Sequence, residues 1–184
     1  GFMGRYQLGV QALEDAGYKD GENLKIEYQN AQGDQAVAQS IAESFVSDSK
    51  DLILAIATPT AQAAYNATKE IPVLITAVTD PIQAGLAKSL EKSETNVTGT
   101  SDATPIDKQF ALIRELLPES KKVGIVYNTS ELNSEVQVAQ AKVIAQKYGL
   151  ELVIKGVASV NDLAQVLDSL LKEVDVLYTP TDNL

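Results

Sequence analysis

The chain has 184 residues with a formal net charge of −10, is 45% hydrophobic, and contains neither Cys nor His. This length and apolar content predict one α/β domain or two small ones with a real hydrophobic core. The missing residue types exclude disulfides, thiolate nucleophiles, the usual zinc sites and histidine acid–base chemistry, and the acidic balance argues against nucleic acid, whose phosphates need a basic face.

Helix-like and strand-like runs alternate through the first half of the chain. Apolar residues at helical spacing predict helices at residues 6–18, 35–46, 58–70 and 81–90. Alternating residues predict a strand at 23–30, and continuous apolar runs typical of strands buried on both faces lie at 51–57 and 71–78. We expect Asp34 and Thr58 to cap the second and third helices, with Pro59 at the first position of the third, and Asp80 to open the fourth.

The same alternation continues after a break at residues 96–103, which we interpret as a strand or segment crossing between two lobes. Thr104 to Asp107 resembles a capping box and predicts the start of a helix. Further strands are expected at residues 121–128, 150–158 and 175–182, and further helices at 134–149 and 159–174. Short connections between alternating strands and helices predict parallel sheets with helices on both faces. We place one lobe at residues 1–99 and the other at 100–184.

Several segment types are missing from the sequence. No run of about 18 apolar residues occurs, so no membrane-spanning segment is predicted. Neither a G-x-G-x-x-G motif nor a P-loop is found, so nucleotide binding has no support. The chain opens abruptly at "GFMGRY" and ends at "YTPTDNL" directly after a predicted strand, and we therefore expect it to be cut at both ends.

Polar side chains follow four of the predicted strands. Ligands of open α/β sheets bind beyond the carboxyl ends of the strands, where helix N-termini also offer free N–H groups to a carboxylate or phosphate. Two polar rims that face each other across a hinge would form a cleft between the lobes. The residues in question are Thr58 and Thr60, Thr79 and Asp80, Asn128 to Ser134, and Thr179 to Asn183.

Helix capping is the competing explanation for several of these side chains. Thr58, Asp80 and Asp182 could each serve only as local caps, and Ser134 with Gln137 matches the capping box S-x-x-Q. Asn128 and Asn133 have no such local role and are therefore better candidates for contact with a ligand. Glu131 and Glu135 are expected to be solvated acids in the first turn of a helix, where they complement its dipole.

An ordered set of segments resembles a known family. The segments are "AGYKDGENLKIEYQNAQGD", "ATPTAQAAYNATKEIPVLITAVTDPIQAGL", "NVTGTSD", "LLPESKKVGIVYNTSELNS" and "YTPTDN". Together they are similar to ABC-transporter substrate-binding proteins with a type I periplasmic-binding fold, in a subgroup associated with uptake of tryptophan and other aromatic or apolar amino acids. The resemblance covers almost the whole chain, although the family has a further strand before the first helix and further βα units after "PTDN".

The resemblance implies a two-lobed clamp that closes on its ligand and presents the closed form to a membrane permease. It implies an extracytoplasmic protein, periplasmic or lipid-anchored, with no cofactor and no catalysis. In such clamps Ser, Asn or backbone N–H groups meet the carboxylate of an amino acid and an Asp meets its ammonium group. The matching positions are Thr58, Thr60, Thr79 and Asp80 in the first lobe, and Asn133, Ser134, Asp182 and Asn183 in the second.

Two other functions remain open at this point. The chain could be the ligand-sensing domain of a transcription regulator on the same fold, or an enzyme of flavodoxin-like or isomerase type, which the missing His, Cys and phosphate loop disfavour. The candidate positions include no Lys or Arg, so a second anionic group on the ligand would lack its usual cationic partner. A neutral amino acid is the ligand that this set of side chains favours, with Tyr127 or Tyr178 as possible aromatic walls.

Overall fold

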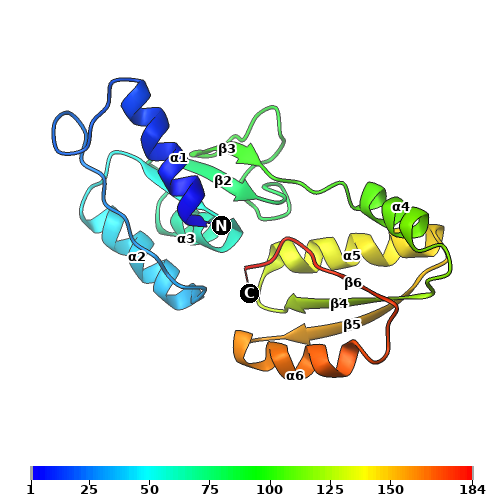
Figure 1. Cartoon of the computed structure of the whole chain (residues 1–184). Coiled ribbons are helices and arrows are strands. Elements are labelled where there is room, and N and C mark those ends of the chain that lie inside the picture. Colours follow the sequence, from blue (N-terminus) through cyan, green and yellow to red (C-terminus); the bar gives the residue numbers. More distant parts are fainter. Residues whose placement is uncertain (1, 184) are drawn as a thin grey trace.

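The computed structural model describes residues 2–183 and contains two parallel sheets. The first sheet has the order β1-β2-β3 and consists of β1 (Ile53–Ile56), β2 (Val73–Val78) and β3 (Val97–Ser101). The second has the order β5-β4-β6 and consists of β4 (Lys122–Asn128), β5 (Glu151–Val157) and β6 (Val176–Tyr178). The two sheets lie in separate units joined by the segment between β3 and the following helix (Figure 1). The predicted α/β class with parallel sheets is therefore confirmed.

Helices cover the sheets unequally. In chain order they are α1 (Phe2–Asp15), α2 (Gln35–Ser47), α3 (Thr58–Ala67), α4 (Ile106–Leu116), α5 (Leu132–Lys147) and α6 (Val160–Leu170). In the second unit α4 and α5 pack on one face of the sheet and α6 on the other, so that each face has its own apolar cluster. In the first unit α3 packs on β1 and β2, α2 packs on α3, and α1 contacts β1. Among the residues that the structure describes, no helix is long and apolar enough to cross a membrane.

The second unit is built around a dense core. The side chains of Phe110 and Ile125 are completely buried, and the ring of Phe110 lies 5.2 Å from the ring of Tyr178. Leu170 closes the opposite face and is also completely buried. Helices α4 and α5 and strand β6 all contribute buried residues to this one cluster. The core therefore holds the carboxyl end of β6 close to α4 and α5.

Two predicted elements are absent from the described structure. Residues 23–30 carry a strand-like pattern, but only an isolated bridge between Asp20 and Leu24 forms there. None of the described strands pairs with this segment, and a strand needs a neighbour for its hydrogen bonds. Residues 81–90 form turns instead of a helix, because Gly85 has a φ of +72° and the segment is too short to sustain helix without packing.

The helix starts also differ from the sequence predictions. Asp34 caps α2 as expected, with its carboxylate accepting a hydrogen bond from the Val37 N–H at 3.0 Å. Thr58 is the first residue of α3 and not its cap, while Pro105 is the cap of α4, which frees the Thr104 hydroxyl for other partners. Helix α5 begins two residues earlier than predicted.

The first sheet is not buried on both faces, contrary to expectation. Leu54 in β1 is 40% exposed and Leu74 in β2 is 38% exposed. Helix α1 is the element that contacts β1 on this side, and Gly9 of α1 faces Leu54. An apolar run therefore identified these strands correctly, but the number of helices that pack on them decided how far each face is buried.

Candidate functional site

The first candidate group lies where β1 and β2 end. Thr58 is 3% exposed, and its hydroxyl has no hydrogen-bond partner among the described residues. The hydroxyl of Thr60 lies 2.5 and 2.9 Å from the carbonyl oxygens of Ile56 and Ala57, so its proton is used within its own helix turn. Thr58 thus offers a buried donor and acceptor, whereas Thr60 keeps only acceptor capacity.

Thr79 and Asp80 follow β2 directly. Thr79 is 6% exposed, and its carbonyl oxygen accepts a hydrogen bond from the Ser101 hydroxyl at 3.0 Å. The carboxylate of Asp80 accepts hydrogen bonds from the backbone N–H groups of Ile82 and Gln83 at 3.0 and 2.9 Å, and from the Gln83 side chain. Asp80 therefore caps the turn that follows it, as the alternative explanation proposed.

An unusual backbone conformation occurs at both of these strand ends. Ala57 has a φ of +84° and Ala77 a φ of +60°, values that L-residues with a Cβ rarely adopt. Such strain costs of order 1–3 kcal/mol per residue and occurs preferentially at ligand sites and switch regions. Ala57 directly precedes the predicted site residue Thr58, and Ala77 lies two residues before the predicted site residue Thr79.

The second candidate group gathers at the ends of β4 and β6. Asp182 accepts hydrogen bonds on one carboxylate oxygen from the Ser134 hydroxyl at 2.6 Å and from the Asn128 N–H at 2.8 Å. Asn133 donates its side-chain amide to the carbonyl oxygen of Thr181 at 3.1 Å. Ser134 lies inside α5 and does not cap it, so the capping-box interpretation was wrong. The structure thus brings Asn133, Ser134 and Asp182 together.

Glu131 is buried at the centre of this second group, contrary to the expectation of a solvated acid. Its side chain is 4% exposed and accepts hydrogen bonds from the amides of Asn128 at 3.1 Å, Asn133 at 3.2 Å, and Asn183. Burial raises the pKa of the Glu131 carboxyl above its usual value, the charge of Asp182 adds to this shift, and the three amide donors oppose it. Glu135 is exposed, as expected.

Asn128 has a local role that the sequence did not indicate. Its side-chain oxygen accepts hydrogen bonds from the N–H of Ser130 at 3.0 Å and from the Ser130 hydroxyl at 2.8 Å. This closes a turn of the kind that Asn favours after a strand. Asn133 differs, because its side-chain oxygen is buried and has no hydrogen-bond partner in residues 2–183.

Each candidate group therefore presents one buried polar atom without a partner. These atoms are the hydroxyl of Thr58 in the first unit and the side-chain oxygen of Asn133 in the second. Side-chain oxygens of Asn96 and Asp102 are also buried without a partner among residues 2–183, but they lie outside the two groups. Leaving such an atom unpaired costs about 1–3 kcal/mol, and proteins rarely tolerate it without a ligand, water or function. A polar ligand placed against α3 and α5 would supply the missing hydrogen bonds.

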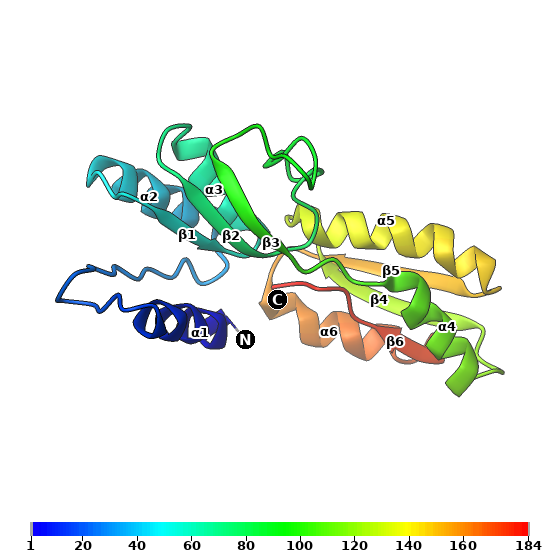
Figure 2. The same ribbon diagram turned by 90° about the horizontal axis from the view of Figure 1, so that it is seen from above.

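The two units approach each other close to these groups. Helices α3 and α5 are in contact, and the Gln35 side chain donates a hydrogen bond to the carbonyl oxygen of Ser130 at 2.6 Å. Seen from above, the turn at the start of α5 lies next to the first sheet (Figure 2). The two candidate groups belong to elements that meet across the junction of the units.

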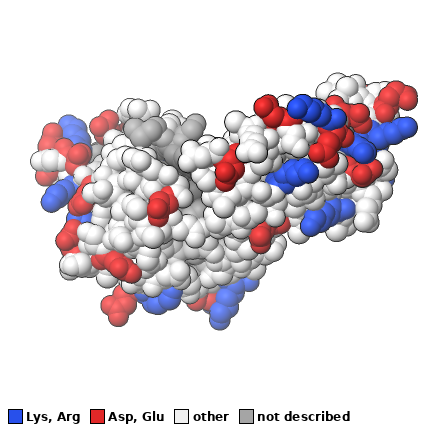
Figure 3. All heavy atoms as spheres, turned by 90° about the horizontal axis from the view of Figure 1, so that it is seen from below, with Lys and Arg blue, Asp and Glu red and all other residues white. Residues whose placement is uncertain are grey.

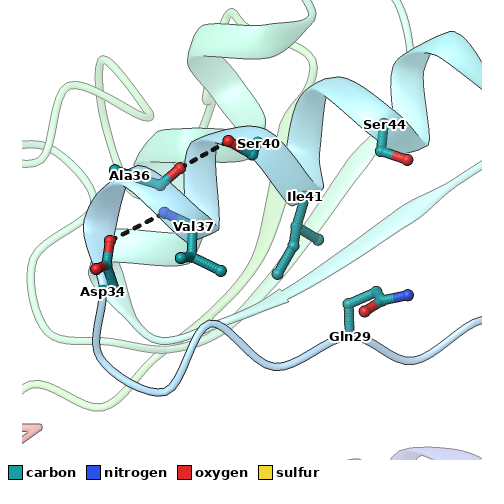
Figure 4. Close-up of a pocket in the computed structure, with 7 residues that line it drawn as sticks. All are labelled: Gln29, Asp34, Ala36, Val37, Ser40, Ile41 and Ser44. Carbon is teal, nitrogen blue, oxygen red and sulfur yellow. Dashed lines mark hydrogen bonds between the residues drawn. The ribbon is translucent and has the colours of Figure 1, made fainter.

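Two open grooves lie away from the predicted side chains. One, of about 400 Å³, runs between α2 and the extended segment before it, with Val37 and Ile41 pointing from the helix toward the segment that carries Gln29 (Figure 4). The other, of about 500 Å³, lies between the end of β5 and α6. Neither groove is lined by a predicted site residue. Among the described residues, no group of His, Cys, Asp and Glu is suited to hold a metal ion.

Sequence reasoning missed two members of the second group. Glu131 was assigned to solvent and Gln137 to a capping box, yet both are buried, with Gln137 only 1% exposed. Gln137 lies one helical turn after Asn133, so both side chains leave the same face of α5. The spacing of four residues between Asn133 and Gln137 was therefore the feature of the sequence that could have identified Gln137 as a member of this group.

Glu131 makes the stability of the protein depend on pH in a defined direction. Between its ordinary pKa of 4.5 and its raised value, the folded state binds more protons than the unfolded state, so the free energy of unfolding falls as pH rises. We expect the Glu131→Gln variant to lose this part of the pH dependence. Urea unfolding from pH 4.5 to 8 measures it.

Glu135→Gln is the matched control, because it removes an exposed carboxylate from the same helical turn and keeps the Glu131 carboxyl, so the fall in the free energy of unfolding with rising pH should remain. The carboxyls of Glu27, Asp107 and Asp175 have lowered pKa values, from ordinary values of 4.5, 3.8 and 3.8, so their contributions change only below about pH 4.5. Equal slopes for the wild type and Glu131→Gln above that pH would contradict the prediction.

The architecture defines a class of protein: two parallel α/β units, joined by a short crossing segment, with polar groups at the carboxyl ends of their strands. A leucine-binding protein from Thermotoga maritima shares this type I periplasmic-binding fold, with a TM-score of 0.70 over 93% of this chain and 49% of that chain, at 16% identity. The family model for ABC transporter substrate binding proteins matches residues 5–184. The chain therefore belongs to the ABC transporter substrate-binding protein family.

Closer relatives are known by name or structure. A tyrosine-binding protein from Clostridioides difficile is 57% identical over 95% of this chain and 51% of its own length. The structure of an ABC domain in complex with L-Trp from Streptococcus pneumoniae is 41% identical, with a TM-score of 0.90 over 95% of this chain and 59% of that chain. The chain spans about half the length of the relatives that it matches.

One further relative was solved without a ligand. The ligand-free, open structure of a substrate-binding protein with adhesive properties from Clostridium difficile is 56% identical, over 95% of this chain and 59% of that chain, but has a TM-score of only 0.63. The L-Trp complex is less similar in sequence and superimposes better. The chain as a whole therefore superimposes better on the relative solved with L-Trp than on the ligand-free, open one.

Proposed function

We propose that this chain is the ligand-binding part of an extracytoplasmic solute-binding protein that captures a neutral amino acid between its units and delivers it to an ABC permease. The proposed lobes of the clamp are residues 1–99 and 100–184, although the last two residues of β3, Thr100 and Ser101, still belong to the first sheet. The observation that carries the proposal is the pair of unpartnered buried atoms, the Thr58 hydroxyl and the Asn133 side-chain oxygen, on α3 and α5, two helices in contact. The family match gives the transport role, and no finding supports a regulator.

The ligand contacts follow from the chemistry of the two groups. Thr58 and Thr79, together with the N-terminal N–H groups of α3, would receive the carboxylate of the amino acid. Thr60, whose hydroxyl proton is already used, would contact the ligand only as an acceptor, for example of the ammonium group. Asp182 would receive the ammonium group, with Asn133, Ser134 and Asn183 beside it. Asp80 already caps the turn that follows it, so its proposed contact with the ligand would be made in addition to that role. No cofactor is part of this proposal.

The side chain of the ligand is proposed to be aromatic. The relatives named for tyrosine and solved with L-Trp support this choice, at 57% and 41% identity. Tyr178 does not provide an aromatic wall, because its ring packs on Phe110 in the core and its hydroxyl donates to Gln109 at 3.0 Å. Tyr127 also packs against the core of the second unit.

The partners and location follow from the family, whose members are solute-binding proteins that work outside the cytoplasm. We propose a permease in the membrane as the macromolecular partner and anchoring by lipid, or free diffusion in the periplasm, as the location. Nucleic acid is not a proposed partner. On the face seen from below, Lys and Arg are interleaved with Asp and Glu and form no continuous basic patch (Figure 3).

A thermal-shift screen of the intact protein tests the ligand class. L-tyrosine and L-tryptophan should stabilise the folded state by about 2.7 kcal/mol at a hundredfold excess over the dissociation constant. Sugars and dicarboxylates at the same concentrations serve as controls and should have no effect. Stabilisation by a sugar or a dicarboxylate, with none by any neutral amino acid, would refute the assignment.

A further inference from the structure

The side-chain amide of Gln137 in α5 is buried and uses all of its hydrogen-bonding capacity. Its oxygen accepts hydrogen bonds from the Thr104 hydroxyl and from the Thr181 N–H, both at 3.0 Å. Its nitrogen donates to the carbonyl oxygens of Asn133 at 3.1 Å and Thr181 at 3.0 Å. Two donors and two acceptors are the full complement of a primary amide.

Three of the four partners determine the orientation of this amide. Turning it over would point its NH₂ group at the Thr181 N–H and its oxygen at two carbonyl oxygens, and only the Thr104 hydroxyl could turn to accept instead of donate. Because Gln137 is 1% exposed, water cannot relieve such contacts. Neither a carboxylate nor an apolar side chain of this size could satisfy the same four groups.

Gln137 binds both backbone polar groups of Thr181, a residue of the loop that follows β6. The N–H and the carbonyl oxygen of Thr181 both bind the amide, as they would bind a neighbouring strand. Asn133 adds a second donor to the same carbonyl oxygen at 3.1 Å. Asp182 and Asn183 follow directly, so the position of Thr181 sets where their side chains begin.

Gln137 also holds the segment that crosses between the units. That segment is tied to the first unit by the Ser101 hydroxyl on the Thr79 carbonyl oxygen at 3.0 Å and by the Asp102 N–H on the Val78 carbonyl oxygen at 3.1 Å. At its other end Thr104 is tied to Gln137. Only two residues, Asp102 and Ala103, therefore separate the anchor at Ser101 from Thr104, whose partner Gln137 also holds the loop of Asp182.

We propose that Gln137 is a positioning residue that couples the crossing segment at Thr104 to the ligand loop at residues 179–183. The proposal rests on the proposed function, because it treats Asp182 and Asn183 as ligand contacts. Thr104 and Thr181 share one acceptor oxygen, so a displacement of the crossing segment shifts the amide that holds the loop. Movement of one unit relative to the other thereby changes the placement of the ligand side chains of the second unit.

The first test needs no ligand and uses hydrogen exchange of the intact protein. Thr104→Val removes one hydroxyl and keeps the shape of the side chain. We expect the Thr181 amide to exchange about fivefold faster in this variant, which corresponds to losing one hydrogen bond of the network. Thr98→Val, at an exposed position of β3, is the control and should leave that amide unchanged. An unchanged rate in Thr104→Val would overturn the proposal.

The second test measures binding of L-tyrosine by calorimetry. We expect Thr104→Val to weaken binding about fivefold in the wild-type background and to have no further effect in Gln137→Leu, because the link is already broken there. An equal effect of Thr104→Val in both backgrounds would overturn the coupling. If the wild type binds no amino acid, the proposed function fails and the exchange of the Thr181 amide still decides the inference. If Gln137→Leu does not fold, the exchange of the Thr181 amide in Thr104→Val likewise decides the inference.

Discussion

The Asp182→Asn variant of the intact protein is expected to bind a neutral amino acid roughly 2–5 kcal/mol more weakly than the wild type. Asp182 is the proposed partner of the ammonium group, and removing one member of a desolvated charge pair costs about this much. Asparagine has nearly the same shape, and its oxygen can still accept from the Ser134 hydroxyl and the Asn128 N–H, which lie 2.6 and 2.8 Å from the carboxylate. Isothermal titration with L-tyrosine measures the change.

Two controls separate charge from architecture in this experiment. Asp168→Asn removes one negative charge from an exposed position of α6, so it reports any effect of net charge alone and should leave the affinity unchanged. Urea unfolding of Asp182→Asn reports its effect on the fold. If that variant loses stability and keeps its affinity, Asp182 serves only to join the ends of β4 and β6.

The Gly99→Ala variant is expected to unfold roughly 3–5 kcal/mol more easily than the wild type, the sum of a strained backbone and an overpacked contact. Gly99 has a φ of +148°, and a Cβ at this position would lie 2.0 Å from the Ile75 carbonyl oxygen and 2.7 Å from the Ile75 nitrogen. The contact is with backbone, which cannot rotate away. Strand β3 would have to separate from β2 to make room.

Urea unfolding again provides the measurement, with Gly4→Ala as the matched control. A Cβ on Gly4 would meet nothing within 4 Å, and the residue lies in α1, so alanine there should raise the free energy of unfolding by up to about 1 kcal/mol. Because β3 leads into the crossing segment, Gly99→Ala should also weaken ligand binding. A Gly99→Ala protein as stable as the wild type would mean that β3 does not pair closely with β2 at Ile75.

Elements with a strong local pattern could be predicted within a residue or two. Strand β4 was expected at 121–128 and spans Lys122–Asn128, and β5 was expected at 150–158 and spans Glu151–Val157. Their continuous apolar residues are paired along their whole length in the structure. The alternating segment at 23–30 failed, because the pattern of a strand does not supply the neighbouring strand that it requires.

The candidate site divides in the same way. The sequence alone determined that polar residues follow the strands, because turn and helix-start residues lie at defined offsets from apolar runs. Only the tertiary structure decided which of them share a partner. Asn183, 52 positions after Glu131, donates to its carboxylate, and Thr104 and Thr181 both donate to the side-chain oxygen of Gln137. Contacts between residues so far apart in the sequence depend on how the chain crosses between the two sheets. The spacing of neighbouring residues does not determine that crossing, so these contacts could not be predicted from the sequence.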